Sequence, residues 1–255
     1  MSRFIDKLNQ VSQAGSQSMG FRAKPISEKR EILLIASLAQ ANVDSLADLT
    51  AGADAGLLHI HKSSSGAEAL QKVSQAVSDI PWGGWLGYSG EAEIKQLGEA
   101  GCDFVVFPAD ISLAMLQSNE VGKILEVEAS LNDGLLRAID ELPADAVLIA
   151  SKQKGEYPLT WHHLMLFQHF ANLLTKPLLV PIPPRVTANE LQAIWKAGVS
   201  GVVIEVGIGQ PTEGLTASRQ AIDKLTFAPH RKRGKLDALL PHVGGDTDTI
   251  TEEEE

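Results

Sequence analysis

The sequence has little with which to build covalent or membrane-spanning structure. Cys102 is its only cysteine, so an intrachain disulfide is excluded. No apolar run reaches the roughly 18 residues that a membrane-spanning helix requires. Residues 1–6 lack the apolar core of a signal peptide. These absences predict a cytoplasmic protein that does not enter a membrane.

Basic residues are also scarce. The chain has 22 Lys and Arg against 32 Asp and Glu, a formal net charge of −10. Six of these acids lie within the last ten residues, and the rest of the chain carries −4 of that charge. A mildly acidic body argues against a nucleic-acid-binding surface. The polar, acidic segment from Gly244 onward has little to bury and is predicted to be a disordered tail.

Eight short apolar runs rich in β-branched residues recur along the chain at intervals of 20 to 32 residues. Each interval can hold a helix and two short loops, and continuous apolar runs are typical of buried parallel strands. A chain of 255 residues has the size of an undecorated (β/α)8 barrel. We therefore predict a single α/β (β/α)8 TIM barrel, with a doubly wound open sheet as the alternative. The predicted strands are 32–37, 55–60, 82–87, 104–108, 124–129, 146–150, 178–182 and 202–206.

Two flanking segments lie outside the predicted barrel. Phe4, Ile5, Leu8 and Val11 recur at helical spacing, and this helix either plugs the N-terminal end of the barrel or docks on another subunit. The predicted division is a helix and linker at 1–28, the barrel at 29–228, and a basic run with the acidic tail at 229–255.

A short motif recurs before three of the predicted strands. Gly52, Gly101 and Gly198 each follow an alanine at the end of a predicted helix, and a small polar residue stands two positions later. Glycine adopts the left-handed conformation that ends a helix at low cost. The three glycines are therefore predicted to be left-handed helix ends.

Alternation along the strands sorts the polar residues, because inward and outward side chains alternate and active sites form at the C-terminal strand ends. Glu126, Glu128 and Glu205 are predicted to face inward, since an unpaired carboxylate among the helices would be costly. Glu126 lies deeper, and a purely structural polar role is a serious alternative for it. The candidate acid–base groups at the mouth are Glu128, Glu205, Lys152, His59 and His61.

Two more specific chemistries match parts of this group. His59 and His61 point the same way on one strand and could share a metal ion, but strands four to eight offer no further histidine, so no metal site is expected. Lys152, late in strand six, resembles the Schiff-base position of class I aldolases. A lysine in a solvated loop, or one that contacts an anion, is the favoured alternative.

An anion site is predicted where strands seven and eight end. Thr187 and Glu190 form a capping box for the helix after strand seven. Glycines after strand eight allow backbone N–H groups to approach a ligand, and a following helix start attracts anions. The predicted anion-binding residues are Arg185, Gly207, Gly209 and Thr212.

The segment 197–207, with the sequence AGVSGVVIEVG, resembles the strand-eight region of phosphate-binding TIM barrels of the ribulose-phosphate and thiamine-phosphate synthase types. The resemblance covers some 30 residues and implies a phosphate site at loops seven and eight. Two features depart from that pattern. Pro183 and Pro184 stand where those families carry two glycines, and Glu213 would repel a phosphate.

These features together predict an enzyme of the lyase or isomerase class that acts on a small phosphorylated or carboxylated metabolite. A barrel that has no catalytic activity and serves in ligand binding or assembly is the first alternative, since the fold hosts many functions. A flavin oxidoreductase that holds FMN in the same loops is the second. No cofactor is otherwise expected.

The segment 159–174 carries more apolar surface than one barrel-facing stripe needs. Leu159, Leu166, Phe170 and Leu173 can line the stripe that faces the barrel, which leaves Trp161, Met165 and, at the edge, His169 on another side. Large aromatic side chains anchor interfaces. A homo-oligomer that uses this helix is therefore expected.

Overall fold

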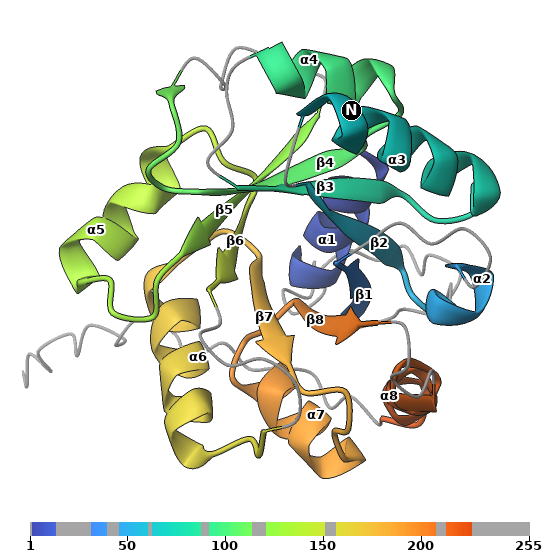
Figure 1. Cartoon of the computed structure of the whole chain (residues 1–255). Helices are drawn as coiled ribbons and strands as arrows, with labels where there is room; N and C mark the ends of the chain where they lie inside the picture. The colour runs from blue at the N-terminus through green and yellow to red at the C-terminus, as the bar shows by residue number, and fades with distance from the viewer. Residues whose placement is uncertain are drawn as a thin grey trace, which may run out of the picture.

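The structure, a computed structural model, describes residues 2–13, 32–39, 46–60, 63–87, 92–113, 121–150, 157–207 and 213–225. Eight parallel strands follow one another in chain order and close into a barrel, in which β8 pairs with β1 (Figure 1). This confirms the predicted (β/α)8 barrel and excludes the open sheet. The strands are β1 (Leu33–Leu38), β2 (Ala55–Ile60), β3 (Trp82–Leu86), β4 (Phe104–Pro108), β5 (Gly122–Val127), β6 (Ala146–Ile149), β7 (Leu178–Ile182) and β8 (Gly201–Val206).

Helices precede and separate the strands. Between β4 and β5 the described residues form no α-helix, and residues 114–120 lie outside the described part. The linker, basic run and acidic tail predicted from the sequence also lie outside it. None of the described helices is long and apolar enough to cross a membrane. The helices are α1 (Arg3–Gln13), α2 (Leu46–Leu49), α3 (Ser63–Ala76), α4 (Ala92–Glu99), α5 (Asp133–Ala138) with the 3-10 turn η3 (Ile139–Glu141), α6 (Trp161–Leu173), α7 (Ala188–Lys196) and α8 (Glu213–Asp223).

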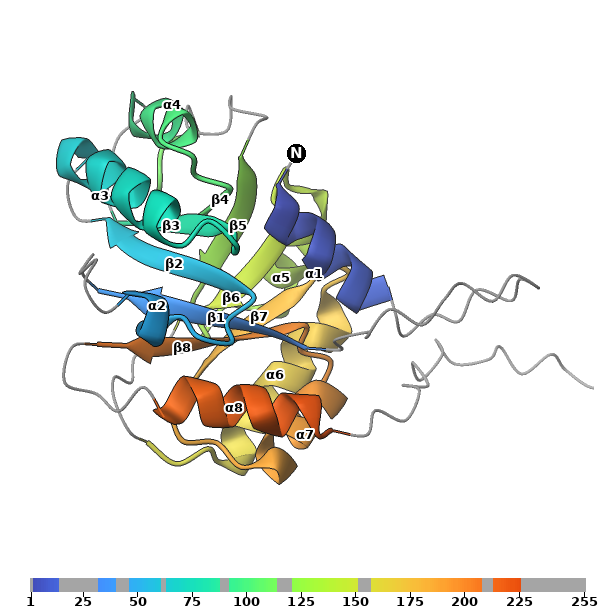
Figure 2. The same cartoon turned by 90° about the vertical axis from the view of Figure 1, so that its right-hand side faces the viewer.

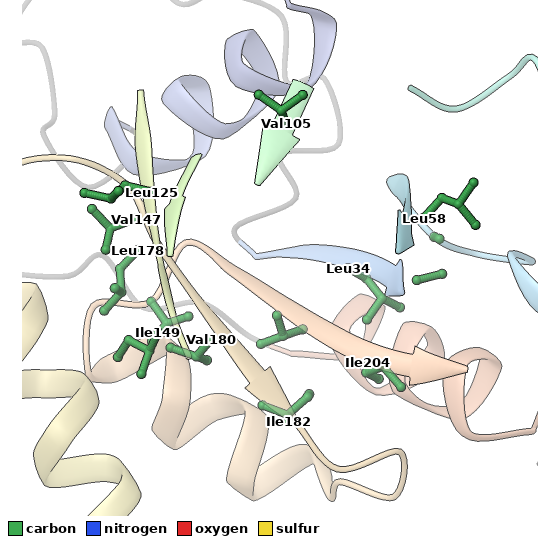
Figure 3. Packing of buried hydrophobic residues seen from close by; sticks show 14 of the residues in the cluster. Leu34, Leu58, Val105, Leu125, Val147, Ile149, Leu178, Val180, Ile182 and Ile204 are labelled. Atoms are coloured by element: carbon green, nitrogen blue, oxygen red, sulfur yellow. The ribbon is translucent and has the colours of Figure 1, made fainter. Parts of the chain in front are cut away.

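Side-chain alternation divides the apolar residues into two cores. The outer core lies between the strands and the helices, and Figure 3 shows part of it, in which Leu34, Val147 and Ile204 come from three different strands. The inner core fills the barrel with neighbouring residues of opposite parity, such as Leu33 and Val203. The fold therefore buries both faces of each strand, which is why the strands are continuous apolar runs.

The N-terminal helix closes one end of the barrel. Figure 2 shows α1 at the end opposite the arrowheads of β2 and β8. Phe4 and Leu8 are fully buried in the inner core, and the Phe4 ring lies 4.5 Å from that of Phe104. Asp103 accepts hydrogen bonds from the backbone N–H groups of Arg3 (2.7 Å) and Phe4 (2.9 Å), which the start of a helix leaves free. Of the two roles expected for this helix, the structure shows the plug.

The recurring helix ends lie at the end of the barrel where the strands begin. Gly52, Gly101 and Gly198 have φ of 86°, 89° and 94°, and they are the only residues with positive φ in the described part of the chain. This confirms the left-handed ends. The aspartate two positions after Gly52 continues the motif, because Asp54 accepts the N–H of Leu34 on the preceding strand at 3.0 Å.

Helix α8 is tied to the same end of the barrel by charge. Arg219 Nη1 donates to Asp54 Oδ2 at 3.0 Å, and both side chains are buried. Arg219 Nε also donates to Asp223 Oδ1, one turn further along α8, at 2.9 Å. The buried aspartate therefore joins β1, β2 and α8 at one point.

Helix α6 buries a wider face than the predicted stripe. Phe170 is buried in the outer core, and Leu159, Leu166 and Leu173 are partly buried against it, as the stripe predicted. Phe167, which the stripe omitted, is buried beside them. The exposure of Trp161 and Met165 agrees with the expectation.

Candidate active site at the barrel mouth

A cavity of about 610 Å³ opens where β2 to β6 end, at the C-terminal face of the barrel. This size falls in the range of small-molecule sites. Its walls are partly apolar, with Leu86 and Leu131 among them, and its polar groups converge from β2, β4 and β5. Four polar groups of this wall carry the candidate chemistry: His59, Asp110, Glu126 and Glu128.

A series of side-chain contacts runs across the barrel at the level of this cavity. Ser37 Oγ on β1 lies 3.0 Å from His59 Nε2 on β2. The His59 ring stacks on the indole of Trp85 on β3, with ring centres 4.5 Å apart and an interplanar angle of 27°. Trp85 Nε1 donates to Glu126 Oε2 on β5 at 2.9 Å. These four inward-facing residues orient an imidazole and a carboxylate toward one space.

The environment of Glu126 alters its acidity. Burial raises the pKa of the Glu126 carboxyl above its ordinary value, and the nearby charge of Asp110 acts in the same direction. The hydrogen bond from Trp85 opposes both effects because it stabilises the carboxylate. A carboxyl with a raised pKa in a cavity is a candidate for accepting and returning a proton.

Glu128 lies at the rim of the same cavity. It follows the end of β5, it is exposed, and Ser130 Oγ donates to its Oε2 at 3.0 Å. The exposed carboxylate therefore faces both the cavity and solvent. Of the candidate acid–base groups, the structure brings His59 and Glu128 to this cavity.

Of the other candidates, the structure describes only Glu205. Glu205 is exposed on β8, three strands from β5 around the barrel, and it is not part of the cavity wall. Lys152 and His61 lie outside the described residues. Glu126, for which a structural polar role was the serious alternative, lies in the cavity wall and accepts a hydrogen bond from Trp85. The inward parity of both residues at the ends of their strands was the signal available.

The opposite side of the mouth carries two of the predicted anion residues. Arg185 is exposed after β7, and Gly207 directly follows β8. Among the described residues no atom lies within 4 Å of a Cβ placed on Gly207, and its φ is not positive, so the described part of the chain gives no packing or backbone reason for glycine there. Gly209 and Thr212 lie outside the described residues.

The first turns of α7 and α8, on this side of the mouth, both make contacts within the described part of the chain. Thr187 and Glu190 form the predicted capping box of α7, in which Glu190 Oε2 accepts from Thr187 N at 2.8 Å. The first turn of α8 packs against the loop after β7, because a Cβ at Gly214 would lie 2.7 Å from Pro184 O. The start of α8 thus lies beside the loop that follows β7.

Comparison with known proteins supports the barrel architecture. No family model matches the sequence, and no curated protein matches it at a significant level. Solved structures do match. A mutant tryptophan synthase alpha-subunit from the hyperthermophile Pyrococcus furiosus aligns with 75% of this chain and 96% of its own, at 14% identity and a TM-score of 0.60.

Two further structures extend this comparison. N-(5'-phosphoribosyl)anthranilate isomerase from Pyrococcus furiosus aligns with 76% of this chain and all of its own, at 15% identity and a TM-score of 0.56. Tryptophan synthase from M. tuberculosis aligns with 85% of this chain and 96% of its own, at 16% identity and a TM-score of 0.56. At these identities the likeness establishes the (β/α)8 barrel and carries no assignment of activity.

Proposed function

We propose that this protein is an enzyme of the lyase or isomerase class that moves a proton on a small phosphorylated or carboxylated metabolite. The proton-transfer groups are Glu126 and His59. The observation that carries the proposal is the contact chain from Ser37 to Glu126, which holds an imidazole and a partly buried carboxylate in one cavity.

Each group has a role that follows from its surroundings. Glu126 takes the proton, because its raised pKa makes it a better base than an ordinary carboxylate while it stays ionisable. The indole N–H of Trp85 fixes the direction of the carboxylate. His59 is oriented by Ser37 and by stacking on Trp85. It donates a proton or a hydrogen bond to the substrate atom on which negative charge develops when Glu126 removes the proton.

The substrate's anionic group is assigned to the other side of the mouth. Acidic residues around the cavity would repel a phosphate or carboxylate, so it binds best toward Arg185 and Gly207. The described residues leave the Cβ position of Gly207 open, which supports a close approach of ligand to backbone. The structurally similar isomerase is named for a phosphoribosyl substrate, which agrees with a phosphorylated ligand here.

Binding tests the anion half of this proposal. Inorganic phosphate should raise the melting temperature of the wild type by mass action, and Arg185→Ala should remove most of that rise. A rise of equal size in both proteins would refute the assignment of Arg185. A yellow purified protein would instead favour the FMN alternative.

Isotope exchange tests the proton-transfer half. The protein is incubated in D₂O with a panel of phosphorylated aldoses and ketoses and of small carboxylates, and proton NMR follows the loss of C–H signals. Glu126→Gln should slow exchange by about 10²–10⁴-fold, the usual contribution of one acid–base group. Glu141→Gln, an exposed site on η3, is the matched control and should leave the rate unchanged. Full exchange by Glu126→Gln, or none by the wild type on any ligand that binds, would overturn the proposal.

A further inference from the structure

Helix α6 differs from the other α-helices in its charge. Its sequence, WHHLMLFQHFANL, contains no Asp, Glu, Lys or Arg. Every other α-helix in the described part of the chain has at least one such residue, in a protein in which 21% of residues are charged. Helices of the outer layer of a barrel expose one face to water, and that face is ordinarily charged. The outer face of α6 is therefore exceptional.

The same face exposes large apolar side chains. Trp161 is 82% exposed and Met165, one turn along, is 68% exposed. The opposite side of the helix is already used, because Phe167 and Phe170 pack into the outer core. Tryptophan and methionine are enriched, and charged residues depleted, at the centres of protein–protein interfaces.

The backbone that presents these side chains is held firmly. Thr160 caps the helix, and the N–H of Thr160 donates to His163 Nδ1 at 3.0 Å. On the neighbouring helix α5 (Figure 1), Asp133 Oδ1 lies 3.1 Å from His169 Nε2. A surface that is ordered before binding loses little conformational freedom on association.

We propose that the α6 face bearing Trp161 and Met165 is an isologous contact with a second copy of this chain. A two-fold axis brings each residue close to its own equivalent, so a fixed charge near the axis would meet a like charge. Two chains of net charge −10 repel each other, and they can approach with least cost through a face without fixed charge. A charged partner, in contrast, would find no complementary charge on α6.

The contact must extend beyond the helix itself. A 13-residue helix is about 20 Å long, and a stable interface buries roughly 800 Å² on each partner. Helix α5 lies beside α6 and exposes the apolar side chain of Leu135, but it also exposes Asp133 and Arg137, so it widens the contact as a polar rim away from the two-fold axis.

Light scattering after gel filtration tests the contact on the full chain across a range of concentrations. The wild type should have twice the chain mass of 27.3 kDa. Trp161→Glu should raise the dimer dissociation constant by about 30-fold or more, the effect of losing an interface hot spot. Leu113→Glu is the matched control, because Leu113 is 79% exposed outside α6 and its replacement should leave the mass unchanged. Circular dichroism checks that each variant folds.

A cross-link gives a second measurement. Met165→Cys should form a covalent dimer on oxidation, since an axis through this face brings the two introduced thiols together, while the native Cys102 is buried. A monomeric wild type at about 50 μM, or a Trp161→Glu variant that remains fully dimeric, would overturn the proposal. A dimer that persists in Trp161→Glu and does not cross-link through Met165→Cys would place the contact elsewhere.

Discussion

Loss of the Asp54 carboxylate is expected to destabilise the barrel more than most single substitutions. The side chains of Asp54 and Arg219 are only 2% and 9% exposed, and their charged atoms lie 3.0 Å apart. Asp54→Ala leaves the guanidinium buried without this partner and also leaves the N–H of Leu34 without its acceptor. Removing one member of a buried ion pair typically costs about 3–5 kcal/mol.

The remaining contacts of Arg219 place the expected cost near the lower end of that range. Its Nε still donates to Asp223, and its Nη2 lies 2.7 Å from the same oxygen, although without the alignment of a hydrogen bond. We therefore expect about 3 kcal/mol for Asp54→Ala, equivalent to a fall in melting temperature of roughly 6–12 °C for a chain of this size. Asp54→Asn should cost less, because the amide oxygen can still accept the N–H of Leu34.

A double-mutant cycle with Arg219→Met isolates the pair. Urea unfolding of the four proteins, followed by circular dichroism, gives the free energies of unfolding. The double variant should be more stable than the sum of the single losses predicts, since it leaves no unpaired buried charge. A loss below about 1 kcal/mol for Asp54→Ala, or additive losses in the cycle, would refute this account of the anchor.

Three further predictions follow from the barrel interior and its mouth. The pKa of Glu126 is raised in the folded state, so this group favours folding below its unfolded pKa, and that contribution is lost as pH rises through the folded pKa. Glu126→Gln should therefore gain melting temperature relative to the wild type as the pH rises from about 4, the ordinary range of a glutamate, through the raised pKa of Glu126, and a constant difference would contradict the shift. Gly83→Ala should cost about 2 kcal/mol because its Cβ would lie 2.3 Å from the Phe104 ring, whereas Gly207→Ala should cost nothing measurable; equal costs in urea unfolding would refute the distinction. Burial raises the pKa of Cys102 to about 12, so a disulfide reagent at about pH 8 should label this thiol only after unfolding, and rapid labelling of the native protein would show that it is accessible.

The inward direction of some side chains at the barrel mouth could be predicted from the sequence, because alternation along a strand depends only on neighbouring residues. A carboxylate between two outward apolar residues, as Glu126 is between Leu125 and Val127, has an inward direction set by the two-residue period of the strand. The same reasoning placed His59 inward. It could not show which inward groups touch, because Trp85 and Glu126 are 41 positions apart and meet only when the barrel closes.

The full width of the face that a helix buries could not be predicted either. Periodicity identified α6 as a helix with surplus apolar surface. Which of its apolar residues became buried depended on where the helix began and on how it packed, and Phe167 faced the outer core as a result. Helical periodicity alone leaves several rotations that differ little in the apolar area they bury.

The sequence by itself determined the number, order and approximate bounds of the strands, the left-handed glycines and the capping box of α7. Each of these depends on residues within a few positions of one another. Tertiary structure alone decided that α1 plugs the barrel, that Asp54 receives Arg219 from 165 positions away, and that Glu126 rather than Glu205 shares a cavity with His59. Those outcomes depend on closure of the barrel, which sets distances between strand ends that no local pattern encodes.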